Sequence, residues 1–389
     1  MNELHLHDMW TTTSPLSNQL LDLFKQSTYS PKQRLNKHAY LKAMRCILAN
    51  LFQAKRFNAK IIYSRNTSKQ SKINVPLIDF LTSIGYVTNH IAPASSRSGI
   101  ASTMELTSET YKAKREQVVI MLNNEEPFIR LRTGGKNKKD LPLPNKPTVI
   151  KKLNNPIKLY NQTWLDNEVV HIDGTKIIPF GWRSFTNDLK HGGRFYWSHM
   201  TLKGDNEKGK EYRKGFLING EPTKELDYKT IHFNLLYNDA GLELKEDAYL
   251  TEGYDRNVIK LAMISFMNIS TRKAFEQKIT LSGNHKNKDR DGFITGMPEG
   301  VKGKDLAKAI DDRHTPIANR FHEKDLGISL QYRDSEILSI ALTELLEAGI
   351  PVLPYHDSLR FPESHYETVK TAMERAYRVK TGFNIKVTE

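Results

Sequence analysis

The segment Val352–Phe361, VLPYHDSLRF, is the sequence feature that most constrains the fold. Apolar residues alternate on both sides of Tyr355–Ser358, which predicts a β-hairpin with these four residues at or near its tip. Aspartate and serine are common in turns because their side chains bond nearby backbone groups. The pair His356–Asp357 at the tip therefore has two interpretations: ordinary turn chemistry, or a hairpin that presents a carboxylate.

The hairpin lies within a part of the chain that mixes strands and helices. The sequence predicts, in order, a short strand Lys224–Tyr228, a helix from about Thr230, and helices over 254–268, 335–349 and 363–382. Gly349 and Gly382 end the last two helices, and a final strand follows over 383–387. Strands and helices in this order predict an α+β fold.

Length and composition limit the class of protein. A chain of 389 residues has room for two or three domains with a sizeable core. Because no run of about 18 apolar residues occurs, we expect no membrane-spanning helix and no membrane partner. The start, MNELHLHDMWTTTSP, lacks the pattern of a signal peptide, and the single cysteine, Cys46, argues against internal disulfides and a thiolate zinc cluster. A soluble cytoplasmic protein is the expectation.

Positive charge is concentrated in the first part of the chain. Residues 1–150 hold 22 Lys and Arg against 10 Asp and Glu, whereas residues 151–389 hold 36 against 34. The first part therefore carries +12 of the net charge of +14. A polyanionic partner, nucleic acid above all, is the leading explanation, and a solvated lysine-rich surface is the alternative.

The first 110 residues predict a small domain of helices followed by a hairpin. Apolar residues at helical spacing predict helices over 38–54 and 75–84, the second ended by Gly85. The residues expected to face inward are Leu41, Met44, Ile47, Leu48, Leu51, Leu77, Ile78, Leu81 and Ile84. Residues 86–106 predict two strands around a turn that carries Arg97 near its tip. This order resembles a winged helix, in which a cationic wing contacts phosphate.

Residues 111–180 predict a basic linker or a thumb-like region before a third domain, 181–389. The stretch RLRTGGKNKKDLPLPNKP is rich in lysine, glycine and proline, which is typical of a mobile loop. Its TGGKNKK lacks the spacing of a phosphate-binding P-loop, so it receives no nucleotide-binding role.

Two aspartates at strand ends point to metal chemistry. Asp227 lies in ELDYK, at the end of a predicted strand, and Asp357 lies in the hairpin tip. If their strands are neighbours in one sheet, the two carboxylates could hold two divalent cations about 4 Å apart, an arrangement that supports in-line phosphoryl transfer. Carboxylate oxygens suit Mg²⁺, with Mn²⁺ as a substitute.

Cations occur where a triphosphate would need them. Arg256 and Lys260 are four residues apart on a predicted helix and project from one face, where they could grip a triphosphate or form a solvated surface. Arg194, in GGRFY, follows two glycines, of which Gly193 would let the backbone approach a nucleic-acid strand. By itself GGR is equally typical of a turn.

Taken in order, these segments resemble the family A DNA polymerases and the related phage-type single-subunit RNA polymerases, over about residues 180–389. GGRFY is similar to the motif that contacts primer and template, ELDYKTIH (225–232) to motif A, RNVIKLAMISFMN (256–268) to motif B, and VLPYHDSLRF (352–361) to motif C. The resemblance implies a palm and fingers, with Asp227 and Asp357 as ligands of two Mg²⁺ ions. It also implies that Arg256 and Lys260 hold the triphosphate, and that Arg194 and His356 lie near the primer end.

The sequence departs from the family at several positions. Lys190 and His191 precede the Gly-Arg pair, where an acidic residue or threonine is usual, and motif C reads His356-Asp357-Ser358, as in the RNA polymerases. His232 stands where DNA polymerases carry a glutamate that blocks the 2′-hydroxyl. The residues expected around the nucleotide are Tyr228, His232, Ile264 and Asn268, the last two replacing aromatic residues. A bulky His232 favours dNTPs over NTPs.

The resemblance implies a compact DNA polymerase without a 3′–5′ exonuclease domain, extending a primer on a DNA template in the replication of a plasmid, phage or integrated element. RNA as template or primer stays open. Two alternatives remain: an RNA polymerase or primase that starts chains without a primer, and an inactive DNA-binding regulator or replication initiator with a polymerase-like domain.

Overall fold

The computed structural model describes residues 2–5, 10–28, 36–65, 72–92, 102–123, 127–135, 137–198, 200 and 207–389 of the chain. The chain consists of two compact units. The N-terminal unit comprises Met1–Pro127 and Trp164–Ile178, and the C-terminal unit comprises Phe128–Thr163 and Pro179–Glu389. The sequence predicts boundaries near residues 110 and 180, which stay predictions; in the structure Phe128–Thr163 belongs to the C-terminal unit and Trp164–Ile178 to the N-terminal unit.

A four-stranded sheet and its packed helices form most of the N-terminal unit. The strands in sheet order are β1 (Asn2–His5), β3 (Ala59–Tyr63), β5 (Ser102–Leu106) and β4 (Val87–His90). β1 is parallel to β3, and the other neighbours are antiparallel. The helices that pack here are α1 (Pro15–Thr28), α2 (Lys37–Arg56) and α3 (Asn74–Ser83), with α2 against β3 and β5.

Smaller elements complete this unit. β2 (Trp10–Thr11) pairs antiparallel with β6 (Met121–Leu122) and contacts α2. The remaining described elements are α4 (Ser108–Lys114), the 3-10 turn η1 (Arg115–Gln117), and the antiparallel pair β9 (Val169–His171) and β10 (Lys176–Ile177).

The predicted helices and strands of the first 110 residues are present. Met44, Ile47, Leu48 and Leu51 are buried on α2, as are Leu77, Ile78 and Leu81 on α3, whereas Leu41 is only half-buried. Ile84 was expected to face inward but is 39% exposed, because it follows the last turn of α3 beside Gly85, whose φ of 75° ends the helix. The turn with Arg97 lies outside the described residues, and the winged helix stays a prediction.

Much of the segment expected to be a linker is ordered structure of the C-terminal unit. β7 (Ile129–Arg132) and β8 (Asp140–Leu141) form a hairpin, and α5 (Pro147–Asp166) follows. Ile129, Leu131 and Leu153 are buried in one apolar cluster with Phe185 and Leu189. The linker interpretation weighed lysine, glycine and proline, whereas the few apolar residues between them decide the packing.

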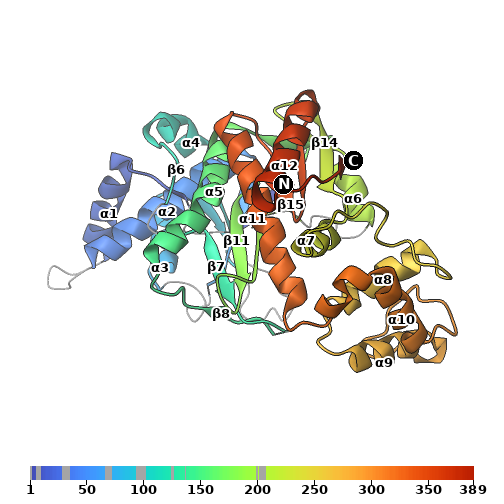
Figure 1. Cartoon of the computed structure of the whole chain (residues 1–389). Coiled ribbons are helices and arrows are strands. Elements are labelled where there is room, and N and C mark those ends of the chain that lie inside the picture. The colour runs from blue at the N-terminus through green and yellow to red at the C-terminus, as the bar shows by residue number, and fades with distance from the viewer. Residues whose placement is uncertain are drawn as a thin grey trace. The chain divides into compact units, whose positions relative to one another are not determined.

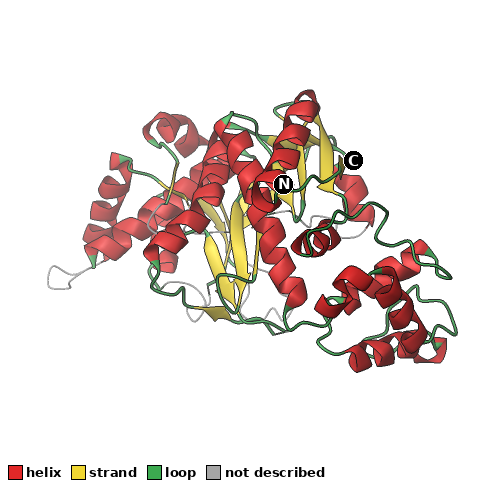
Figure 2. Ribbon diagram, in the orientation of Figure 1, coloured by secondary structure: helices red, strands yellow, loops and turns green. Residues whose placement is uncertain are grey.

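The C-terminal unit contains an α+β arrangement with two sheets (Figure 2). The first includes antiparallel neighbours in the order β13 (Phe216–Ile218), β14 (Glu221–Tyr228), β16 (Ser358–Pro362) and β15 (Leu353–Tyr355). β17 (Val387–Thr388) pairs with Asp227 and Tyr228 at the end of β14. This strand is shorter than predicted, since only those two residues of β14 pair with it.

The second sheet has the order β12 (Gly192–Trp197), β11 (Gly181–Thr186), β7 and β8. The long helix α11 (Leu326–Glu347) packs on β12, and α12 (Tyr366–Thr381) packs on α11, β14 and β16. The buried apolar residues along α11 explain why this helix packs against both β12 and α12: Leu330, Leu338, Ala341 and Leu345. The predicted helix over 335–349 is thus the second half of a longer one.

A cluster of shorter helices belongs to the same unit and includes α8, α9 and α10 (Figure 1). The remaining helices of the unit are α6 (Glu207–Arg213), α7 (Ile231–Asp239), α8 (Arg256–Phe266), α9 (Arg272–Ser282) and α10 (Gly303–Arg313). α9 packs against both α8 and α10. In the described part of the chain, no helix is both long and apolar enough to cross a membrane.

Candidate active site

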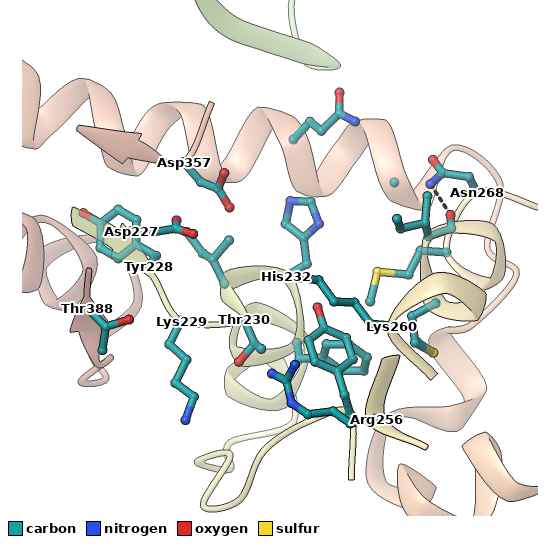
Figure 3. A pocket seen from close by; sticks show the side chains of 18 of the residues that line it. Asp227, Tyr228, Lys229, Thr230, His232, Arg256, Lys260, Asn268, Asp357 and Thr388 are labelled. Atoms are coloured by element: carbon teal, nitrogen blue, oxygen red, sulfur yellow. Dashed lines mark hydrogen bonds between the residues drawn. The ribbon is translucent and has the colours of Figure 1, made fainter. Parts of the chain in front are cut away.

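Sheet pairing brings the two predicted aspartates together. Asp227 of β14 pairs with Ser358 of β16, and Asp357 immediately precedes Ser358 in the two-residue turn between β15 and β16. Both aspartates line one cavity of about 690 Å³. Figure 3 shows their carboxyl groups directed towards the same space. The two aspartates are 130 residues apart in the chain, and the pairing of β14 with β16 brings them together.

The turn that carries Asp357 has an unusual backbone. His356 has a φ of 59°, in the left-handed region that non-glycine residues rarely adopt. Its ring lies edge-on to Tyr196, with centroids 5.9 Å apart. His356 therefore lies in the turn immediately before Asp357, with its ring against Tyr196. It is not among the residues that line the cavity.

A buried polar network fastens this hairpin to β14. Ser358 Oγ donates to Glu225 Oε1 (2.9 Å), and Arg360 Nη2 donates to Glu225 Oε2 (2.7 Å). Arg360 Nη1 also donates to Thr223 Oγ1 at 3.0 Å, and Arg360 is 4% exposed. These contacts support the register in which Asp227 pairs with Ser358, the residue next to Asp357.

The electrostatic setting of Asp227 is unusual for a carboxyl group that opens onto a cavity. The surrounding protein displaces water, and the negative charges of Asp357 and Glu225 lie close by. These effects raise the pKa of Asp227 to about 8, although the Tyr228 amide and Lys260 act in the opposite direction. Two carboxyl groups that repel each other in this way are poised to accept a cation.

Tyr228 differs from the other residues expected around a nucleotide. It lies at the cavity wall, but it is only 2% exposed and its hydroxyl donates to the Met373 carbonyl at 2.8 Å. Burial also raises its pKa. Alternation along β14 turns this side chain towards α12, away from the face of Asp227. Tyr228 is therefore a core residue.

The predicted cations line the same cavity from helix α8. Asp255 caps this helix by accepting from the Asn257 amide (2.8 Å), and Arg256 and Lys260 follow one turn apart. Arg256 Nε donates to Asp247 Oδ2 at 2.8 Å, and the guanidinium lies over the Tyr249 ring. Lys260 is exposed and has no ion-pair partner among the described residues. The two cations are thus not equivalent.

The last turn of α8 and the residues just after it also line this cavity. Ile264 is 65% exposed, and Asn268 Nδ2 donates to the Ile264 carbonyl at 2.6 Å (Figure 3). Gly327 of α11 faces Asn268 so closely that an added Cβ would lie 2.1 Å from its Oδ1. Both predicted positions therefore line the cavity, and a glycine at 327 leaves room for the Asn268 side chain.

A buried carboxylate links two predicted residues that lie on different elements. Asp334 of α11 is fully buried and accepts from Arg194 Nη2 at 2.5 Å. His232 Nε2 lies 2.8 Å from the same Asp334 oxygen. His232 lines the cavity, whereas Arg194 does not. Asp334 thus couples the residue expected at the sugar to the residue expected at the primer.

Arg194 lines a second cavity, of about 530 Å³, in the same unit. Gly192 and Gly193 precede it with φ values of 70° and 74°, and a Cβ at Gly193 would lie 2.7 Å from the Phe185 ring. The glycines are therefore required by the backbone and by packing. Gly134, Gly135 and Lys138 of the basic TGGKNKK stretch also line this second cavity.

The donor set fits divalent cations that are shared with a phosphate substrate. No group of three or more His, Cys, Asp and Glu side chains with metal-site geometry occurs among the described residues. Mg²⁺ commonly takes one or two carboxylates and completes its shell with water and phosphate oxygens. Asp227 and Asp357 meet that requirement, and their mutual repulsion, seen in the raised pKa of Asp227, is what a cation would relieve.

Three contributors to the site were missed by sequence reasoning: Asp247, Tyr249 and Asp334. Asp247 and Tyr249 lie between α7 and α8, where no periodic pattern marks them. Asp334 did leave a signal, because it is one turn after Leu330 and one turn before Leu338 on the apolar face of its helix. A carboxylate on a buried stripe requires a partner, and here it has two.

No protein-family model and no curated protein matches the chain. Among solved structures, it is similar to the POL domain of Pol1 from M. smegmatis in complex with DNA primer-template and dNTP, with 14% sequence identity and a TM-score of 0.35. The match covers 62% of this chain and 51% of that one, so this chain matches about half of that structure's length.

Proposed function

We propose that the protein is a template-directed nucleotidyltransferase, most simply a DNA polymerase that extends a primer. The observation that carries the proposal is the cavity in which Asp227 and Asp357 lie on adjacent strands opposite Arg256 and Lys260. A pair of carboxylates facing a pair of cations suits a triphosphate with its divalent ions. The replication of a plasmid, phage or integrated element remains part of the proposal.

In the proposed reaction the primer 3′-oxygen forms a bond to the α-phosphorus of the nucleotide. The bond from the α-phosphorus to the bridging oxygen breaks, pyrophosphate leaves with that electron pair, and the hydroxyl proton passes to solvent. Two divalent cations, held by Asp227 and Asp357, would supply activation of the hydroxyl and charge neutralisation on the departing oxygens. Lys260 would neutralise phosphate charge directly, and Arg256 would do so on leaving Asp247.

Primer extension tests the proposal. DNA and RNA templates, each with and without a primer, should be given dNTPs or NTPs in Mg²⁺ or Mn²⁺. We expect dNTP incorporation that depends on primer and template. Incorporation of NTPs without a primer would instead identify an RNA polymerase or primase. Sequence-specific DNA binding without incorporation under every condition would favour the regulator or initiator.

We expect His232→Ala to raise NTP use relative to dNTP use by about 10- to 100-fold, because shape-based exclusion in a pocket is worth about this much. The imidazole lines the cavity and is held by Asp334, so its removal opens space beside the sugar. Single-turnover incorporation of matched dNTP and NTP measures the ratio. His365→Ala, at a histidine outside the cavity, is the control and should leave the ratio unchanged. An unchanged ratio in His232→Ala would contradict this role.

The raised pKa of Asp227 predicts a pH dependence of the metal-free protein. The native chain keeps this proton up to about pH 8, whereas the unfolded chain loses it near pH 3.8. Because the native state binds more protons in this window, the free energy of unfolding should fall as pH rises from about 4 to about 8. Mg²⁺ should displace the proton and remove this slope.

Urea unfolding across this pH range, in EDTA and in Mg²⁺, measures the effect as a difference between the native chain and Asp227→Asn. The variant lacks the titrating group, so it should lose the Asp227 contribution to the slope while keeping those of other groups. Equal slopes in both proteins would show that Asp227 does not carry the proton.

A further inference from the structure

The N-terminal unit has a cavity of its own, of about 370 Å³, that the proposed activity does not use. One wall is helix α2, and the other is formed by Thr11, Thr12 and Thr13 with Asn123. Pairing of β2 with β6 brings the threonine segment and the segment that ends with Asn123 together, since Thr11 lies opposite Met121. The cavity is therefore built from segments more than 100 residues apart.

Three basic side chains of α2 line the cavity: His38, Lys42 and Arg45. Spacings of four and three residues place them on one face of the helix. Among the described residues, no carboxylate lines this cavity. The cavity therefore combines positive charge with a concave wall.

Arg45 is the key observation, because the Nε atom of its guanidinium has no hydrogen-bond partner among the described residues. Its Nε is buried and has no hydrogen-bond acceptor, and the described residues give it no ion pair. Leaving a buried donor of a charged group unsatisfied is costly, and an anion beside the Arg45 side chain would offset this cost by its charge. A guanidinium presents a fork of donors that matches two oxygens of a phosphate.

The opposite wall supplies neutral hydrogen-bonding groups. Thr11, Thr12 and Thr13 give three consecutive hydroxyls. Thr12 Oγ1 accepts from the Ser14 amide at 3.2 Å and keeps its O–H to donate, whereas Thr13 Oγ1 donates to Met121 Sδ at 3.9 Å. Hydroxyls facing an arginine and a lysine can surround an anion with several oxygens. The N-terminal unit holds 17 Lys and Arg against 12 Asp and Glu, and this positive excess favours a polyanion as the source of that anion.

We propose that this cavity binds a phosphate group of a polynucleotide strand, through Arg45, Lys42 and the threonine hydroxyls. The phosphate has two sources of the same chemistry, a 5′-terminal phosphate or an internal phosphodiester. The site does not depend on the proposed nucleotidyl transfer, since it shares no residue with the carboxylate cavity.

Binding of single-stranded DNA to the full chain, without Mg²⁺ or nucleotides, tests the site by fluorescence anisotropy. We expect Arg45→Met with Lys42→Gln to weaken binding about tenfold or more, the loss typical of charge-assisted hydrogen bonds. The slope of log K against log salt should fall by about 0.7 for each lost phosphate contact. An oligonucleotide with a 5′-phosphate and one with a 5′-hydroxyl separate the two sources: loss confined to the former indicates a terminal phosphate.

The matched control is Arg115→Met with Lys112→Gln, which removes the same charge from exposed positions of the same unit. Equal weakening by both pairs would overturn the site in favour of general attraction. Should Arg45→Met fail to fold, Lys42→Gln with His38→Gln, at a half-buried and an exposed position, carries the same test. Asp227→Asn should bind DNA as the native chain does, so failure of the proposed activity and failure of this site give different results.

Discussion

Asp227→Asn and Asp357→Asn are each expected to reduce nucleotide incorporation by about a thousandfold or more, because a two-metal clamp contributes several kcal/mol and each 1.4 kcal/mol is a factor of ten. The amide keeps the shape of the carboxylate but removes the charge that a cation needs. Both aspartates line the cavity, and a single strand pair sets their relation. Single-turnover primer extension in Mg²⁺ measures the loss.

DNA binding must be measured beside incorporation, since the proposal separates the two. Both variants should bind primer-template about as tightly as the native chain in the absence of Mg²⁺. Asp289→Asn makes the same chemical change at an exposed aspartate outside the cavity and should leave incorporation unchanged. Native rates in either active-site variant would remove the basis of the proposed function.

Asp334→Ala is expected to lower the free energy of unfolding by about 3–5 kcal/mol, because removing one partner of a buried ion pair leaves the other charge uncompensated. Asp334 is fully buried, and its partner Arg194 has a side chain 15% exposed. The same substitution releases His232, the second contact of this carboxylate. Urea unfolding of the metal-free protein measures the change.

A double-mutant cycle separates the interaction energy of the Arg194–Asp334 ion pair from the energy lost through poorer packing. Arg194→Leu with Asp334→Leu should be less destabilised than the sum of the single variants, by about 1–3 kcal/mol, since no charge is then left buried. Glu344→Ala is the control on the same helix: its partner Arg375 is 57% exposed, so we expect a loss of at most about 1 kcal/mol. Additive losses in the cycle would show that Arg194 and Asp334 do not stabilise each other.

Local periodicity predicted many of the elements that carry the site. The hairpin at 352–361, the strand that ends with Asp227 and the helix that carries Arg256 and Lys260 all occur where the sequence indicates them. The reason is that each has a pattern decided by near neighbours: alternation in β14, a capped apolar face in α8, and turn residues between β15 and β16. The α+β class follows from the same elements.

Features that depend on distant residues were not predicted. Residues 128–163 resemble a linker in composition, yet Ile129, Leu131 and Leu153 find apolar partners at Phe185 and Leu189. Arg256 was expected to be available for a triphosphate, but Asp247 accepts from it, and nothing in the spacing of the two residues indicates this. Tyr228 was expected at the nucleotide; it lies at the cavity wall, and its hydroxyl donates to the Met373 carbonyl of α12, a contact that its sequence position does not indicate.

The sequence by itself determined which side chains are able to perform chemistry, because charge, hydrogen-bonding capacity and local backbone preference belong to residues and their neighbours. Only the tertiary structure decided which of them meet. Register between β14 and β16 sets Asp227 beside Asp357, and burial of Asp334 joins His232 to Arg194. The pairing of β2 with β6 closes the cavity around Arg45. These contacts depend on desolvation and packing between segments that are far apart in the chain. Such energies leave no pattern in the local sequence.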